Sequence, residues 1–315
     1  MDVDCPALPA GTLGLAAAVT AALLWAIGSM LYRMVGRVLP PVRLNLAKGL
    51  AASLLFAGVV GWHWWRPGAG PLAVPPRMLA LLAASGVIGI GCGDTCYFAA
   101  LNRLGPRRVL LLFTLAPVLT ALLAWPLLDE RPGALQAAGI LLTCGGVGWV
   151  IAERTPGGGG FDAAGTWFGI GAALCQAVGS LLSRHVFEQT GCDAALSALV
   201  RILGGTAVLL LMLPLDRALR VADDQPGTRA TRPGPVATWL LLGAAMFLGT
   251  FLGIWLQQLA FKLSDNVGVA ATLLATSPLF ILPLAAAAGE RVSARAVAGA
   301  ALSVLGVAVL LGALG

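Results

Sequence analysis

The chain has 315 residues, of which 58% are hydrophobic and only 11% are charged, and its formal net charge is +6. A soluble domain carries about 25% charged residues, so this composition excludes a soluble globular protein and predicts an integral membrane protein. The Lys and Arg residues form no dense basic run, which argues against nucleic acid as a partner and fits loops that lie against anionic lipid headgroups.

Ten apolar stretches of the length needed to cross a bilayer follow one another along the chain. We expect helices at 11–32, 42–62, 78–101, 107–128, 133–152, 164–184, 194–214, 236–261, 267–288 and 294–314. Strands of a membrane barrel would alternate polar and apolar residues over about ten positions, which these stretches do not. The predicted fold class is therefore an all-α integral membrane protein with ten transmembrane helices.

The two halves of the chain repeat the same motifs in the same order. Residues 26–33 read AIGSMLYR and residues 177–184 read AVGSLLSR, and an Ala-Gly-x-x-Leu-x-x-x-Gly-Val pattern occurs in the fifth and tenth helices. Five helices is an odd number, so the second repeat enters the membrane from the opposite side and the halves are inverted. We expect the first repeat at 1–152, a Gly-rich linker at 153–163 and the second repeat at 164–315.

Further paired motifs link the halves to a known family. They are an Arg at the start of the second helix of each half (Arg43, Arg201), a Pro in the fourth (Pro117, Pro278) and a Glu-Arg pair after it (Glu130, Glu290). In this order the motifs resemble the drug/metabolite transporter superfamily in its ten-helix EamA-type form. The resemblance implies a carrier of small metabolites, often an exporter of amino acids or related compounds, with no enzyme activity and no cofactor.

Polar side chains inside the first and sixth predicted helices recur at the spacing of one helix face. They are Trp25, Ser29 and Tyr32 in the first helix and Gln176, Ser180 and Ser183 in the sixth. Matching stripes at repeat-related positions predict the walls of a shared central cavity. The alternative is that these groups form hydrogen bonds across a close helix–helix contact.

Two charged residues lie inside predicted spans, Lys48 in the second helix and Asp94 in the third. An isolated charge at the centre of a membrane helix costs roughly 2.5–3.5 kcal/mol on insertion scales, so we expect the two to pair or to face a water-filled cavity. Asn45 and Tyr97 share their helix faces. In the functional interpretation Asp94 binds a substrate ammonium group or a coupling proton and Lys48 binds a carboxylate. In the other interpretation they form a static ion pair that fixes the helices, or Lys48 extends its ammonium group to the membrane interface.

The second repeat lacks this pair of charges and has Ile254 and Thr206 at the corresponding positions. Two neighbouring amides, Gln257 and Gln258, lie in its third helix. Residues present in only one half are better candidates for substrate specificity than residues that recur in both. A cavity with one cation, one anion and several amides suits a zwitterion or another polar metabolite.

The orientation of the chain in the membrane has two readings. The odd-numbered connections between helices carry more Lys and Arg than the even-numbered ones, among which Arg201 is counted. The positive-inside rule then places the odd-numbered connections in the cytoplasm and both termini outside. The resemblance implies termini inside. Pro117 and Pro278 are expected to break or kink their helices, which provides the bending that alternating access needs.

The sequence therefore predicts a secondary transporter for a small polar metabolite in the cell membrane, with the lipid bilayer, a small-molecule substrate and a coupling proton or ion as partners, acting as a monomer or homodimer. No metal site is expected; Cys92 and Cys96 share a helix face but have no companion ligands. A membrane-embedded enzyme acting on a lipid or lipid-linked substrate and a structural or receptor-like protein are the alternatives. The former would need a cluster of ionisable residues near one interface.

Overall fold

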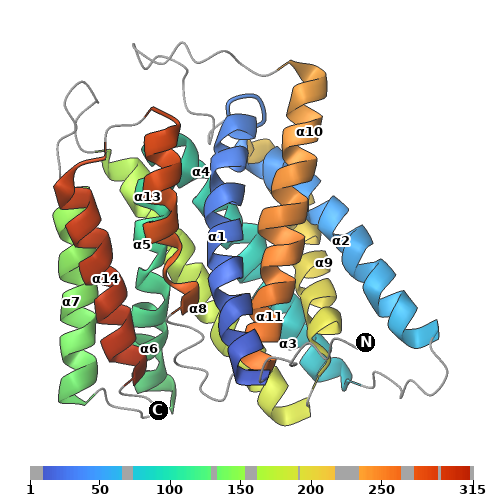
Figure 1. Ribbon diagram of the computed structural model, residues 1–315. Helices are drawn as coiled ribbons and strands as arrows, with labels where there is room; N and C mark the ends of the chain where they lie inside the picture. The colour runs from blue at the N-terminus through green and yellow to red at the C-terminus, as the bar shows by residue number, and fades with distance from the viewer. Residues whose placement is uncertain are drawn as a thin grey trace, which may run out of the picture.

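The computed structural model describes residues 10–65, 74–128, 133–152, 162–190, 192–216, 234–263, 273–289 and 292–312. All regular structure within these residues is helical, as Figure 1 shows. The first half contains α1 (Ala10–Gly36), α2 (Pro41–Trp65), α3 (Pro76–Gly86), η1 (Val87–Gly93), α4 (Asp94–Leu104), α5 (Pro106–Phe113), α6 (Leu115–Leu128) and α7 (Ala134–Ile151). The second half contains α8 (Ala163–Thr190), α9 (Ala194–Met212), η2 (Leu213–Asp216), α10 (Pro235–Ala245), η3 (Met246–Leu252), α11 (Gly253–Leu263), α13 (Ser277–Ala287) and α14 (Ala294–Gly312).

Nine helical segments in the described part of the chain are long and apolar enough to cross a membrane. They correspond to nine of the ten predicted spans. The predicted span at 267–288 is described only from residue 273 onward, and within it the apolar helix is Ser277–Ala287. The protein is a multi-pass, all-α membrane protein. Glu130, Glu290 and most of the predicted linker lie outside the described residues.

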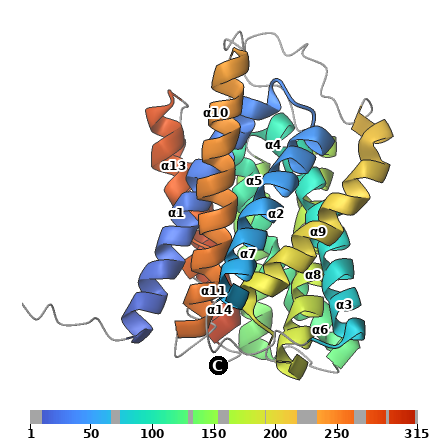
Figure 2. The ribbon, with the colours of Figure 1, turned by 90° about the vertical axis from the view of Figure 1, so that its right-hand side faces the viewer.

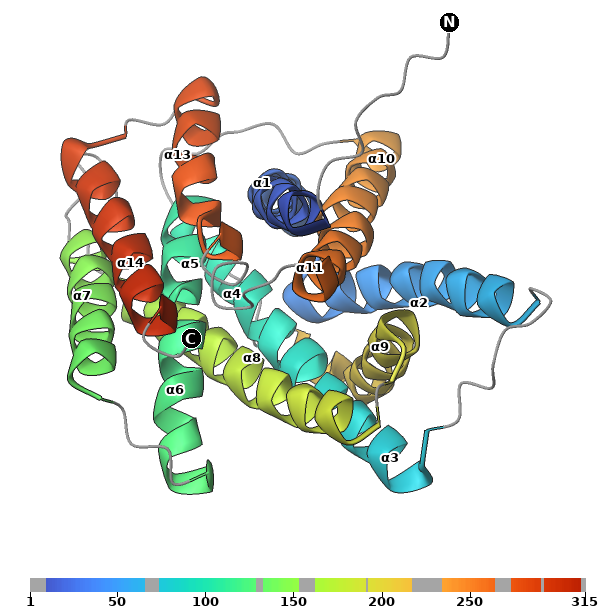
Figure 3. The same ribbon diagram turned by 60° about the horizontal axis from the view of Figure 1, so that its bottom comes forward.

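The two halves run in opposite directions. The continuous segment α3–η1–α4 rises from the lower end of the molecule in Figure 1, whereas α10–η3–α11 descends from the upper end. Helix contacts follow the same symmetry: α1 packs on α10, η3 and α11, and its counterpart α8 packs on α3, η1 and α4. The pairs α2–α9 and α7–α14 each join equivalent helices, and Figure 3 shows α7 and α14 side by side at one edge of the bundle.

The fourth helix of each half is interrupted near its proline, as predicted. In the first half, α5 ends at Phe113 and α6 begins at Leu115, two residues before Pro117. In the second half, α13 begins at Ser277 and Pro278 lies in its first turn. A proline lacks the backbone N–H and its ring clashes with the preceding turn, so it is best accommodated in the first turn of a helix. α13 also contains a second proline, Pro283, in its interior.

The third helix of each half contains a π-helix, η1 in the first and η3 in the second, which sequence periodicity did not predict. A π-helical turn is wide, and its carbonyl groups are poorly aligned for regular hydrogen bonding. Such turns are rare in proteins, and those that occur are often at functional sites. In η1 the carbonyl oxygens of Ile90 and Gly91 accept hydrogen bonds from side chains. These turns sit at mid-helix in both halves, next to the residues that line the cavity described below.

Each π-helix is crossed closely by the first helix of the other half. A methyl group added to Gly28 in α1 would lie 2.8 Å from the Cα atom of Gly249 in η3. At the equivalent crossing, a methyl group added to Gly179 in α8 would lie 3.3 Å from the Cα atom of Gly89 in η1. The glycines of the repeated Ala-x-Gly-Ser motif therefore permit backbone-to-backbone packing between the two halves.

Candidate functional site

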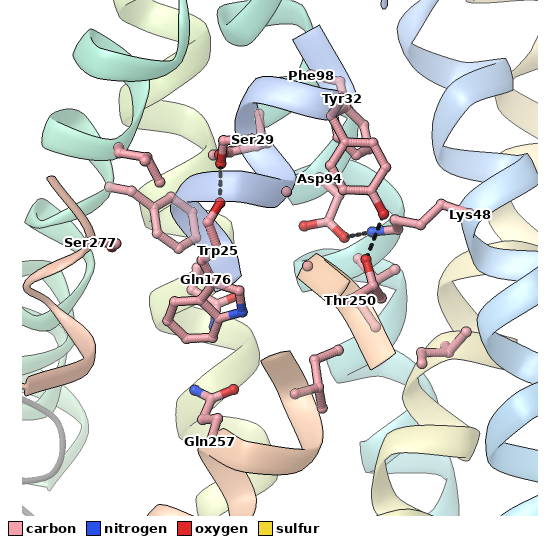
Figure 4. A pocket seen from close by; sticks show the side chains of 18 of the residues that line it. Trp25, Ser29, Tyr32, Lys48, Asp94, Phe98, Gln176, Thr250, Gln257 and Ser277 are labelled. Carbon is pink, nitrogen blue, oxygen red and sulfur yellow. Dashed lines mark hydrogen bonds and ion pairs between the residues drawn. The ribbon is translucent and has the colours of Figure 1, made fainter. Parts of the chain in front are cut away.

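A cavity of about 180 Å³ lies between the two halves of the protein. Its walls come from α1, α2, η1, α4 and α5 of the first half and from α8, α9, η3, α11 and α13 of the second (Figure 4). Eight of the eleven predicted site residues line it: Trp25, Ser29, Tyr32, Lys48, Asp94, Tyr97, Gln176 and Gln257. The polar stripe of the first helix thus faces a cavity over its whole length.

Lys48 and Asp94 form an ion pair across the cavity wall, and Figure 4 shows the ammonium and carboxylate groups pointing at each other. Pairing of the two in-span charges was predicted and is confirmed. The ammonium group of Lys48 also lies 5.4 Å from the centre of the Phe98 ring, within the range of a cation–π interaction. The side chain of Lys48 is 7% exposed and that of Asp94 is 27% exposed, so the carboxylate is the partner that the cavity can reach.

A hydrogen-bonded chain links α1 to α4 on another wall. The Ser29 hydroxyl donates to the Trp25 carbonyl oxygen at 2.6 Å, and the Ser29 Oγ and the Tyr97 hydroxyl oxygen are 2.6 Å apart. A serine hydroxyl has one proton, so the Tyr97 hydroxyl is the donor to Ser29. This bond holds the Tyr97 ring at the cavity, where it also packs edge-on against Phe113.

Tyr32 connects the two halves directly. Its hydroxyl oxygen lies 2.7 Å from the Oγ1 atom of Thr250, which belongs to η3. Both side chains are buried within the protein and line the cavity. The bond therefore ties the first helix of one half to the π-helix of the other, one turn from the Gly28–Gly249 crossing.

Asn45 does not line the cavity, although it was predicted to contact the substrate. It is fully buried, and its Nδ2 atom donates to the Ile90 carbonyl oxygen at 2.7 Å and to the Thr95 Oγ1 atom at 3.1 Å. The Thr95 hydroxyl in turn donates to the Gly91 carbonyl oxygen at 2.6 Å. Asn45 therefore satisfies carbonyl groups of the π-helix η1, a structural role that its spacing from Lys48 did not reveal.

The polar residues of the sixth predicted helix, which is α8, have two roles: one lines the cavity and another forms a helix–helix contact. Gln176 lines the cavity, and its Nε2 atom lies 3.3 Å from Ser180 Oγ, but Ser180 itself is not part of the wall. Ser183 is buried against α3, with its hydroxyl oxygen 2.8 Å from that of Ser85. The end of the stripe thus serves helix packing. The side chain of Gln258 lies outside the described residues.

Sequence reasoning missed Arg201, Thr250 and Ser277, all of which line the cavity. Arg201 was counted among the loop arginines, but it lies inside α9. Thr206, predicted to occupy the place of Lys48 in the second repeat, instead packs against Gly49 of α2 and is absent from the wall. The residue at the matching depth is Arg201: Lys48 is the eighth residue of α2, and Arg201 is the eighth residue of α9.

The described residues contain no group of three His, Cys, Asp or Glu side chains that could hold a metal ion. The thiols of Cys92, Cys96 and Cys175 are free, and none of the three lines the cavity. The chemistry available in the cavity is therefore that of one ion pair, one further guanidinium group, amides, hydroxyls and aromatic rings.

A model of the EamA-like transporter family matches residues 12–152 and again residues 163–312. The chain belongs to the EamA-like transporter family. This EamA-like protein is thus a multi-pass membrane transporter of the drug/metabolite transporter type. One solved crystal structure, described only as that of a protein, shares 24% sequence identity with it, covers 95% of each chain and superposes with a TM-score of 0.61, which shows a common fold. No curated protein matches the chain.

In this EamA-like transporter the cavity lies where inverted-repeat transporters bind their substrates, at the interface between the halves and at mid-helix. About half of the residues that line it carry polar or charged groups, and the rest, such as Leu110 and Phe113, are apolar. Polar and charged side chains within membrane helices are costly and mark substrate or ion pathways. The arrangement is suited to reversible binding of a small polar solute.

Proposed function

We propose that the protein is a secondary transporter that exports a small polar metabolite, an amino acid or a related compound, across the cytoplasmic membrane by alternating access. The observation that supports this most directly is the cavity between the inverted halves, lined by Lys48, Asp94, Gln176 and Gln257. An amino acid presents one cation and one anion, and a cavity with paired charges and amides offers a partner for each.

The size of the cavity favours a compact solute. Its volume of about 180 Å³ is below the roughly 300–1,000 Å³ of pockets that take drug-sized ligands. A large hydrophobic drug therefore fits less well than a metabolite of amino-acid size. Asp94 also provides a carboxylate that can exchange a proton or bind a cation when Lys48 moves away, so it is the proposed site of coupling to a proton or ion.

The residues that face the cavity favour a carrier over an enzyme. The described wall contains one carboxylate, Asp94, and no histidine. Both histidines of the chain, His63 and His185, are exposed at helix ends. Hydrolysis or group transfer on a lipid would require a positioned base or nucleophile together with a group that stabilises developing charge.

The test compares metabolites inside and outside cells that overproduce the wild-type protein or the Asp94→Asn variant. We expect one class of polar metabolite to accumulate outside wild-type cells and to be retained in the variant. Cys144→Ser, which changes an exposed thiol in α7, is the control and is expected to export normally. Equal amounts of each variant in the membrane must be verified by immunoblot.

Transport by purified protein in liposomes is measured as well, because liposomes contain no other transporter. If neither cells nor liposomes show flux of any polar metabolite that depends on the protein, the transport function is wrong. If flux is present and Asp94→Asn leaves it unchanged, transport stands and the assignment of Asp94 to the site is wrong.

A further inference from the structure

Arg201 is the charged residue of the cavity that the ion pair does not account for. It lies in α9 and reaches over η1, where a methyl group added to Gly89 would be 3.5 Å from its Nη2 atom. Its Nε atom is buried and has no hydrogen-bond partner among the described residues. Arg201 lines the cavity together with Ala198 and Ile202 of the same helix.

The charges of the described wall do not cancel. Lys48 is neutralised by Asp94 in the ion pair, and Arg201 then remains as a surplus positive charge. Asp94 is close enough to interact electrostatically with Arg201 as well, but one carboxylate cannot balance two cations. In a region of low dielectric constant a surplus charge is costly unless an anion or water compensates it.

The inverted repeat explains how the surplus arises. Each half supplies one basic residue from the same depth of its second helix, Lys48 from α2 and Arg201 from α9. Among the described residues of the wall, only the first half supplies an acid. The second half has Ile254 in the place of Asp94, and Ile254 lines the cavity without a charge. Because Ile254 stands where an acid would be, Arg201 has no carboxylate partner from its own half, and its Nε has no hydrogen-bond partner among the described residues.

A purely structural role accounts poorly for this arginine. Structural arginines in this protein have partners: Arg43 Nε lies 2.6 Å from Asp216 Oδ2, and Arg103 Nε lies 2.9 Å from Asp162 Oδ2. A guanidinium group carries five N–H donors in a planar fork that matches a carboxylate with two parallel bonds. The guanidinium group of Arg201 therefore offers the cavity a binding group for a carboxylate.

We infer that the solute is a net anion, an acidic amino acid or a comparably small organic acid with one more acidic than basic group, and that Arg201 binds its additional carboxylate. This inference rests on the proposed transport function and narrows its substrate class. Neutral amino acids would leave Arg201 uncompensated. They are therefore the poorer substrates.

The test uses two amino acids that have nearly the same shape and differ by one charge, L-aspartate and L-asparagine. The full chain is purified, reconstituted into liposomes and assayed for counterflow of each labelled compound. We expect the wild type to move aspartate at least tenfold faster than asparagine. Arg201→Gln should lower aspartate flux at least tenfold and affect asparagine much less. Arg201→Lys, which keeps the charge and loses the fork, should retain part of the aspartate flux.

Arg77→Gln is the matched control, because it removes the same charge from an exposed position at the start of α3, outside the cavity. It should transport as the wild type does. If Arg201→Gln fails to fold, as judged by size-exclusion chromatography, the comparison of Arg201→Lys with the wild type carries the test. Aspartate flux that is lowered but not abolished, with asparagine flux less affected, then supports the inference, and aspartate flux at the wild-type level contradicts it.

Four results contradict the inference. Asparagine flux equal to or above aspartate flux in the wild type overturns it and leaves the transport function intact. So does an equal loss of both fluxes in Arg201→Gln. If L-glutamate and L-glutamine, a second pair that differs by one charge, also show no preference for the acid, the substrate class is wrong. Absence of flux for every solute, charged or neutral, overturns the transport function itself and the inference with it.

Discussion

Lys48 and Asp94 are held together inside the membrane-spanning region, so each depends on the other for its charge to be tolerated. Removing one partner of a fully buried ion pair costs roughly 3–5 kcal/mol because the other charge is left uncompensated. The Asp94 side chain is 27% exposed to the cavity, so we expect a smaller loss for Lys48→Met and Asp94→Asn. The double variant should recover most of that stability. Thermal unfolding in detergent measures all three.

Transport by the same double variant separates the two interpretations of the pair. If Lys48 and Asp94 form a static ion pair, a stable double variant should transport at the wild-type rate. If they take part in binding or coupling, the double variant should be stable and inactive, and this is the result we expect. Equal stability losses that simply add in the double variant would contradict the pairing itself.

Asn45 supports the site from behind without touching the cavity. Asn45→Val removes the donor to the Ile90 carbonyl oxygen, and an unsatisfied buried carbonyl costs about 1–3 kcal/mol. We expect a loss of stability in that range and slower transport, because η1 positions the residues that follow it. Cys144→Ser, at an exposed position of α7 outside the wall, should leave both the unfolding temperature and the transport rate unchanged. An Asn45→Val variant with wild-type stability would show that η1 does not need this bond.

Residue patterns predicted the cavity wall where a regular helix carries the side chains. Trp25, Ser29 and Tyr32 all face the cavity because α1 is continuous from Ala10 to Gly36. Arg201 could have been found by counting residues from the start of α9 rather than by aligning motifs. The motif alignment matched it to Arg43, which lies in the first turn of α2 and has a side chain that is 60% exposed.

The elements that define the cavity most closely are the two π-helices, and no local sequence signal predicts them. A π-turn inserts an extra residue into the helix, and each residue rotates the direction of the side chains by about 100°. Asp94 immediately follows η1, so its direction depends on that insertion. Apolar composition alone, which predicted the span at 78–101, contains no information about it.

The crossing of α1 over η3 requires glycine at two facing positions. In Gly28→Ala the new methyl group would lie 2.8 Å from the Gly249 Cα atom, and overpacking of this kind costs about 1–3 kcal/mol. We expect a lower unfolding temperature and reduced transport, because the helices must separate to accommodate the methyl group. Unfolding and liposome flux measurements check both effects.

Gly243→Ala is the matched control within the segment that α1 crosses. A methyl group at Gly243 in α10 meets no atom within 4 Å, and alanine is favoured over glycine in a helix by up to about 1 kcal/mol. This variant should be as stable as the wild type or slightly more stable. A Gly28→Ala variant that behaves in the same way would mean that α1 and η3 are not in close contact.

At the scale of the molecule, the duplicated fold is symmetric in its packing and asymmetric in its charges. The sequence predicted the helices and their inversion because repeated motifs and span length are sufficient for both. The exact limits of the repeats, 1–152 and 164–315, stay a prediction. Orientation stays a prediction, because two of the arginines counted for it serve the fold: Arg43 forms an ion pair with Asp216 and Arg103 forms one with Asp162. Figure 2 shows α2 and α9, the equivalent helices that pack on each other, from the side.

Inversion makes a prediction that does not depend on the orientation. Arg77 at the start of α3 and Gly234 before α10 begin equivalent helices of the two halves. In a protein with the six native cysteines replaced, Arg77→Cys and Gly234→Cys should react with a membrane-impermeant maleimide from opposite sides. One variant should label in intact cells and the other only after permeabilisation. If both variants label from the same side, the repeats are parallel, which contradicts the opposite directions of α3–η1–α4 and α10–η3–α11.

The same experiment determines the orientation. If Arg77→Cys labels in intact cells, the odd-numbered connections lie in the cytoplasm and the termini lie outside, as the positive-inside rule predicts. If Gly234→Cys labels in intact cells, the termini lie in the cytoplasm, as the family resemblance predicts.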